Sequence, residues 1–220
     1  MKRYLPKTAA KQLLIMLSAL ILVLFIVKYV VYKDSHLSFL IWNIFLAWIP
    51  LIILYIISAL PQKIINSVIA IALYIFWLIF YPNAPYIITD LVHIANIPIS
   101  LTFQSTDLLS WLKISIIFIT IWLGVLLSFY SLYPVHNLVK NKIGYLFSKL
   151  FIIFFSILSA YGIYIGRFTR LNSWDLFTSP KQVISLISSS LHFENLMFVV
   201  LFALTFYISY TSLHIIKHNK

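Results

Sequence analysis

Cysteine is absent from this sequence, and only 5 of its 220 residues are acidic. The lack of cysteine excludes disulfides, thiolate zinc sites and cysteine nucleophiles. Charged residues of both signs make up 10% of the chain and hydrophobic residues make up 62%, whereas a soluble domain has about 25% charged and about 45–50% apolar residues. The composition therefore predicts a protein that crosses a lipid bilayer several times. Glycine is also scarce, with 4 residues, so close helix packing through small residues is not expected.

The net charge of +11 does not indicate nucleic-acid binding. A nucleic-acid surface would show basic residues along one polar face with aromatics between them. Here the lysines and arginines occupy short segments between apolar runs, as orientation signals of membrane proteins do.

Six apolar runs approach the length of about 20 residues that a membrane-spanning helix needs. No alternating pattern of barrel-strand length is present, so we expect helices. The predicted fold is an all-α polytopic bundle in which residues 1–220 form a single integral membrane domain. The predicted spans are 13–31, 37–60, 64–81, 114–133, 146–165 and 196–216.

Lysine and arginine in short loops predict the orientation, because these residues favour the cytoplasmic side. With six spans, most of the basic loops fall on the side that holds both termini, so we expect a cell-membrane protein with cytoplasmic N- and C-termini. All the acids then fall in outward segments: Asp34, Asp90, Asp107, Asp175 and Glu194.

The first motif, residues 80–93 (FYPNAPYIITDLVH), directly follows the third apolar run. We expect Pro82 and Pro85 to stop the helix and form an extended turn. Thr89 or Asp90 could then cap a new helical turn, which would place Asp90 and His93 on one face. A plain elbow with a capping Asp and a surface His is the simpler interpretation.

The second motif, residues 166–175 (GRFTRLNSWD), follows the fifth run on the same predicted outer side. A helical extension would put Arg167 and Arg170 on one face, where Asp90 and Asp175 are their natural carboxylate partners. The alternative is that the arginines reach lipid headgroups while Trp174 lies at the interface.

The two motifs resemble the signature segments of a bacterial membrane-protein family catalogued as domain of unknown function 1361. The resemblance extends roughly from the second span to the sixth. It implies a similar arrangement of spans and no established activity.

After the second motif, Ser179-Pro180 predicts the start of a short helix on the outer interface. This helix could cover a cleft between the motif loops, or it could be a plain connector.

One functional hypothesis is an outward site for an anionic or lipid-linked ligand. Arg167 and Arg170 would bind phosphate or carboxylate, with Asn83, Asn172 and Trp174 around them. If the site is catalytic, Asp90 or Asp175 would be the general base and His93 the acid or orienting group.

No string resembles a known nucleotide, metalloprotease or hydrolase motif, so no reaction is identified and no cofactor is implied. A metal site could draw on Asp90, His93, Asp175, His192 and Glu194, but the nearby arginines would repel a cation, and none is predicted. Two alternatives remain. The charges could connect helix ends or dock a partner in a non-catalytic subunit. Alternatively, the protein could be an enzyme or transporter acting on envelope lipids, although the span centres carry no ionisable group.

Overall fold

The computed structural model describes residues 1–61, 64, 67–97, 108–169, 171, 173–189 and 192–218. Every regular element in these residues is a helix, which confirms the predicted all-α fold. The elements are η1 (Lys2–Tyr4), α1 (Thr8–Tyr32), α2 (Phe39–Ala59), α4 (Val68–Phe80), α5 (Asn83–Tyr86), η2 (Ile87–Asn96), α6 (Leu108–Ile143), α7 (Tyr145–Phe168), α8 (Asp175–Thr178), α9 (Pro180–Ser189) and α10 (Phe193–His218).

Six helical segments in the described part of the chain are long and apolar enough to cross a membrane. The protein is therefore a multi-pass membrane protein, as predicted. The third segment, Val68–Ala95, continues well beyond the predicted end at residue 81 and contains the first motif. The other segments are Thr8–Tyr32, Phe39–Ala59, Leu108–Ile143, Tyr145–Phe168 and Phe193–His218.

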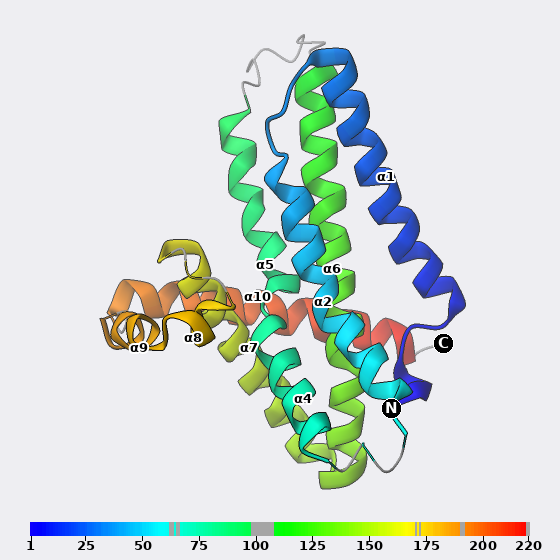
Figure 1. Cartoon of the computed structure of the whole chain (residues 1–220), viewed down its shortest axis with the longest axis vertical. Coiled ribbons are helices and arrows are strands. Elements are labelled where there is room, and N and C mark those ends of the chain that lie inside the picture. Colours follow the sequence, from blue (N-terminus) through cyan, green and yellow to red (C-terminus); the bar gives the residue numbers. More distant parts are fainter. Residues whose placement is uncertain are drawn as a thin grey trace.

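The helices do not all run in one direction. In Figure 1, α1, α2, η2 and α6 run side by side along the long axis, whereas α10 runs across α6. The helix α7 packs on both α6 and α10. Tyr133 of α6 lies near residues from both terminal regions of the chain. Its ring is 6.2 Å from the Tyr4 ring, and its Oη is 3.5 Å from Nε2 of His218.

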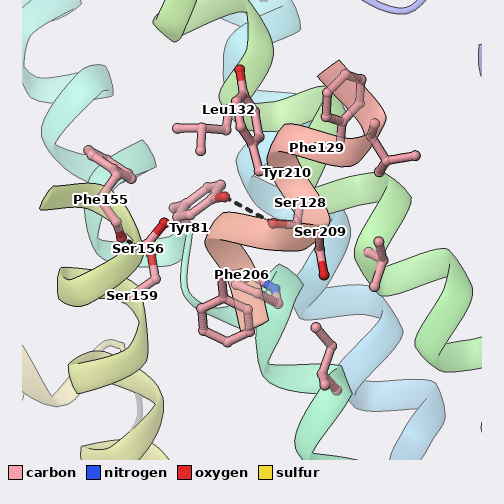
Figure 2. A pocket seen from close by; sticks show the side chains of 14 residues that line it. Tyr81, Ser128, Phe129, Leu132, Phe155, Ser156, Ser159, Phe206, Ser209 and Tyr210 are labelled. Atoms are coloured by element: carbon pink, nitrogen blue, oxygen red, sulfur yellow. Dashed lines mark hydrogen bonds between the residues drawn. The ribbon is translucent and has the colours of Figure 1, made fainter. Parts of the chain in front are cut away.

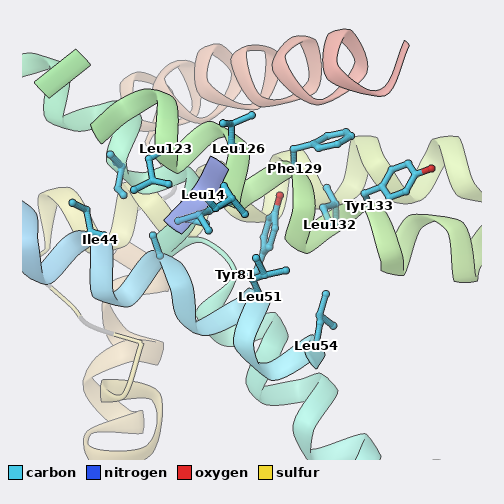
Figure 3. Close-up of a cluster of buried hydrophobic side chains, with 14 of the residues drawn as sticks. Leu14, Ile44, Leu51, Leu54, Tyr81, Leu123, Leu126, Phe129, Leu132 and Tyr133 are labelled. Atoms are coloured by element: carbon cyan, nitrogen blue, oxygen red, sulfur yellow. The ribbon is translucent and has the colours of Figure 1, made fainter. Parts of the chain in front are cut away.

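The largest buried cluster lies where α1, α2 and α6 meet the chain around α5 (Figure 3). Leu14 of α1, Leu51 of α2 and Leu123 of α6 are fully buried within it. A smaller cluster between α7 and α10 includes Ala160 and Ala203. Other faces of the same helices expose large apolar side chains, as expected for surfaces solvated by lipid.

Asp34 connects the end of α1 to the start of α6. Its Oδ1 accepts hydrogen bonds from Nζ of Lys28 at 3.2 Å and from the backbone N–H of His36 at 2.6 Å. Its Oδ2 lies 2.5 Å from Nζ of Lys113. Because the Lys28 side chain is only 1% exposed, this carboxylate compensates a buried cation at the end of the bundle.

Two of the four glycines let other helices approach α5 closely, which the scarcity of glycine had not led us to expect. A Cβ at Gly124 of α6 would lie 2.9 Å from Cβ of Ile87 and 3.0 Å from the carbonyl oxygen of Ala84. A Cβ at Gly162 of α7 would lie 3.1 Å from Cγ of Pro82. The first motif is therefore packed between α6, which it contacts at Gly124, and α7, which it contacts at Gly162.

Candidate functional site

The first motif stays helical through both prolines, so the prediction of an extended turn is wrong. Pro82 has φ −58° and ψ −22° and is the N-cap of α5, and Pro85 lies within α5. Proline is tolerated in the first turn of a helix because the N–H groups there need no intrahelical partner. The prolines therefore divide the helix into α4, α5 and η2 without turning the chain away from the bundle.

At the helix break next to Pro82, the side chain of Asn83 supplies a hydrogen bond to the end of α4. Its Nδ2 donates to the carbonyl oxygen of Phe80 at 2.9 Å, at the end of α4. The same amide donates to Oγ of Ser173 in the second motif, also at 2.9 Å. Asn83 thus joins the two motifs across 90 residues of sequence.

Asp90 is buried where three helices meet. Its side chain is 1% exposed. Nδ2 of Asn43 in α2 donates to its Oδ2 at 2.8 Å, and Nη1 of Arg167 in α7 lies 3.4 Å from its Oδ1. Asp90 does not cap a helix, since its oxygens accept hydrogen bonds from other elements. The neighbouring Thr89 instead donates to the carbonyl oxygen of Tyr86 at 2.8 Å.

Arg167 lies at the centre of this polar cluster. Besides Asp90, it reaches Oη of Tyr86 at 3.4 Å and Nε2 of His93 at 3.5 Å. Asp90 and His93 share one face of η2, as predicted, with Oδ1 and Nε2 3.9 Å apart. His93 can accept from Arg167 only while its Nε2 carries no proton, because a guanidinium has donors only.

These contacts are long for hydrogen bonds of a guanidinium group. Charge-assisted N–H···O bonds are normally about 2.7–2.9 Å long, and an arginine has five donors. The contacts recorded for Arg167 within the described residues are 3.4–3.5 Å long. Its side chain is also 22% exposed.

The helix α7 ends at Phe168, and the prediction that Arg167 and Arg170 share one helical face falls on a residue outside the described part of the chain. Arg170 and Asn172 lie outside the described residues. Asp175 begins α8 and accepts a hydrogen bond from Thr178 at 3.3 Å. Trp174 packs edge-on against Trp42 of α2, with ring centroids 6.5 Å apart.

A cavity of about 450 Å³ lies between the two motifs. Its volume falls within the range of about 300–1,000 Å³ that is usual for small-molecule sites. Its lining comes from α2, α4, α5, α7, the second motif and α9: Trp42, Asn43, Leu46, Leu78, Ile79, Pro82, Asn83, Tyr86, Leu158, Tyr161, Gly162, Ile163, Ile165, Gly166, Leu171, Ser173, Trp174 and Val183.

The short helix predicted after Ser179 is present as α9 (Pro180–Ser189). Val183, which is 4% exposed, lines the cavity. The idea that this segment covers a cleft between the motifs therefore agrees with the position of its buried face.

A second, much smaller cavity of about 20 Å³ lies between α4, α6, α7 and α10 (Figure 2). Tyr81 and Ser128 form a 2.9 Å hydrogen bond at its edge. Since one water needs about 10–15 Å³, this cavity has room for a single water and not for a ligand.

A family model described as "Protein of unknown function (DUF1361)" matches residues 42–209. The chain belongs to this family. The match confirms the resemblance inferred from the two motifs, and it includes the whole polar cluster and the lining of the larger cavity. No curated protein and no solved structure matches the chain.

Sequence reasoning missed part of the site of this DUF1361 protein. Trp42 resembled an interfacial aromatic, and Gly162 resembled an ordinary residue of a span, yet both line the cavity. Asn43 also lines the cavity, and it was not among the predicted site residues. The signal that could have found Asn43 and Gly162 is rarity, because amides and glycines are uncommon in these apolar runs.

The site carries ionisable groups inside membrane-crossing segments. Asp90 and His93 belong to Val68–Ala95, and Arg167 belongs to Tyr145–Phe168. Such groups are costly in a bilayer and typically mark functional positions. No cluster of three or more candidate metal ligands occurs within the part of the chain that the structure describes.

Proposed function

We propose that this protein binds an anionic, membrane-borne ligand at the junction of its two motifs, with Arg167 as the cationic contact. One observation carries the proposal: both motifs supply walls to the same ligand-sized cavity, of about 450 Å³. The guanidinium of Arg167 adjoins that cavity through Tyr86, one of the lining residues. Recognition would follow the preference of arginine for phosphate and carboxylate oxygens.

The positive-inside pattern supports an extracytoplasmic position of this site in a cell membrane, with both termini in the cytoplasm. Asn43 lies in the second turn of α2, and Arg167 is the penultimate residue of α7, so both are near helix ends. The ligand would therefore have its charged group near the outer membrane surface.

The test is lipid retention by the purified protein. Wild-type protein and Arg167→Gln would be isolated in a mild detergent, and the bound lipids extracted and identified. We expect the wild type to retain an anionic lipid or lipid-linked anion that the variant loses. Lys149→Gln, which removes one positive charge on the first turns of α7, is the matched control and should retain it. Equal retention by Arg167→Gln and the wild type would contradict the proposal.

A second candidate function is structural, and the burial of Asp90 favours it. Asp90 joins η2 to α2 through Asn43 and to α7 through Arg167. In that case the network would hold helix ends together or shape a surface for a partner subunit. Exchanging the two charges, as Asp90→Arg with Arg167→Asp, could restore a purely structural pair but should not restore ligand retention.

A further inference from the structure

The cavity between the motifs reaches the lipid-facing surface of the helices. Trp42 of α2 and Leu78 of α4 both line it. These side chains are also 54% and 36% exposed, respectively. Both lie within membrane-crossing segments, Phe39–Ala59 and Val68–Ala95. A molecule dissolved in the bilayer can therefore reach the cavity without passing through water.

Hydrocarbon side chains form much of the cavity wall. Leu46 of α2, Ile79 of α4 and Leu158 of α7 line it, and Val183 of α9 closes it with a buried apolar side chain. Such walls offer no hydrogen bonds to a sugar or a hydrated ion, whereas they suit methylene groups.

Polar groups of the lining come from the motifs, from the adjoining turn of α2 and from Tyr161 of α7. Asn43, Asn83, Tyr86 and Ser173 line the cavity. Tyr86 contacts Arg167 at 3.4 Å, and Asn43 contacts Asp90 at 2.8 Å. The site therefore combines apolar walls with a polar region next to a guanidinium, which matches an amphiphile with a negative headgroup.

We propose that the ligand is an anionic phospholipid-like molecule that enters from the bilayer past Trp42 and Leu78, places a hydrocarbon chain in the cavity and binds its phosphate at Arg167. This inference rests on the proposed function and adds to it the class of ligand and the route of entry. The lipid chain displaces no protein side chain, because the cavity already has the volume of a ligand site.

The experiment uses the full-length protein in vesicles of a zwitterionic phospholipid. A minor fraction of phosphatidic acid would carry a diazirine on one acyl chain. After illumination, the cross-linked residues would be mapped by mass spectrometry. We expect cross-links to Leu46, Leu158 or Val183 inside the cavity, and their loss in Arg167→Gln. Cross-links confined to outward lipid-facing residues such as Phe118 and Val200 would overturn the proposal.

A cavity-filling variant gives a second measurement. Leu158→Trp would occupy the space of the lipid chain, and Leu150→Trp makes the same change at a 52% exposed position of the same helix. We expect the cavity cross-links to disappear in Leu158→Trp and to persist in Leu150→Trp. If both variants keep the cavity cross-links, the acyl chain of the lipid does not occupy this cavity. Should Leu158→Trp fail to fold, the wild-type cross-link map still decides the question.

Glycerol phosphate, which has the headgroup and no chain, separates the two proposals. If glycerol phosphate binds in an Arg167-dependent manner but no cavity cross-links form, the proposal of an anion site is supported. The proposal that a lipid chain occupies the cavity is then overturned. If neither probe depends on Arg167, the proposed function fails as well.

Discussion

Arg167 approaches Asp90 with one guanidinium nitrogen at 3.4 Å, while the other carboxylate oxygen of Asp90 accepts a 2.8 Å hydrogen bond from Asn43. The carboxylate is 1% exposed and the arginine 22% exposed. The two partners therefore depend on one another unequally. Asp90 needs its cation because its side chain has almost no access to solvent, whereas the side chain of Arg167 is partly exposed.

This inequality predicts different costs for the two single substitutions. Arg167→Gln leaves a buried carboxylate without its cation and should lower the free energy of unfolding by about 3–5 kcal/mol. Asp90→Asn keeps a hydrogen-bonding amide beside Asn43 and should cost less, about 1–2 kcal/mol. The measurement is thermal unfolding in detergent, followed by tryptophan fluorescence.

The double variant Asp90→Asn with Arg167→Gln provides the control. It removes both charges and should be more stable than Arg167→Gln alone, because no unpaired buried carboxylate remains. A double variant that is stable but retains no lipid would separate ligand binding from the structural role. Strictly additive losses would show that the pair is not coupled and would contradict the account of Asp90.

Gly124 should not tolerate a side chain. In Gly124→Ala the new Cβ would lie 2.9 Å from Cβ of Ile87 and 3.0 Å from a backbone oxygen, so α5 would have to move away from α6. We expect a loss of about 1–3 kcal/mol, which is typical of overpacking. In Gly166→Ala the nearest atoms would be 3.5 and 3.8 Å away, so that variant is the matched control in the same unfolding assay and should lose little or nothing. Equal stability of the two variants would refute the close packing of α5 on α6.

Sequence reasoning predicted the helical class and the six apolar segments because length and hydropathy determine these features directly. It failed at Pro82 and Pro85, where proline statistics favour a helix end. The outcome there depends on tertiary contacts, since Asn83 satisfies the carbonyl of Phe80 and the neighbouring helices hold α5 in place. A local rule does not contain that information.

The site was predictable in part. The spacing of Asp90 and His93 gave their shared face, and the match of arginine to carboxylate anticipated a partner for Arg167. The sequence could not reveal the cavity, because its walls come from segments that are remote along the chain, such as Leu46 and Leu158. It also could not show that Asn43 donates a hydrogen bond to Asp90.

The buried hydrogen bond between Trp77 and Ser131 should contribute measurably to stability. Nε1 of Trp77 donates to Oγ of Ser131 at 2.9 Å, and the two side chains are 3% and 0% exposed. Ser131→Ala would leave the indole N–H without a partner and should cost about 1–3 kcal/mol. Ser115→Ala on the same helix removes a hydroxyl that bonds the Trp111 carbonyl at an exposed position, and it should cost close to zero. Similar losses in both variants would show that the Trp77 bond has no special weight.

The stability of the protein should fall in acid as Asp34 becomes protonated. Partial burial acts to raise the pKa of Asp34, but hydrogen bonds from Lys113, from the His36 N–H and from Lys28 outweigh it and lower the pKa from 3.8 to about 2. The depressed pKa means that folding favours the ionised form. Its contribution is therefore fully present above about pH 4 and is lost as the pH falls toward 2.

A shift of this size corresponds to about 2 kcal/mol at neutral pH. Unfolding temperatures of the wild type and Asp34→Asn, measured in detergent from pH 7 down to pH 2, test this expectation. The wild type should be the more stable at pH 7, and the difference should shrink as the pH falls below 4, because a protonated Asp34 resembles the amide. Glu194→Gln, which removes an exposed carboxylate at the start of α10, controls for the general effect of losing one acid. A difference between wild type and Asp34→Asn that stays constant from pH 7 to pH 2 would contradict the assignment of Asp34 as the carboxylate that compensates Lys28 and Lys113.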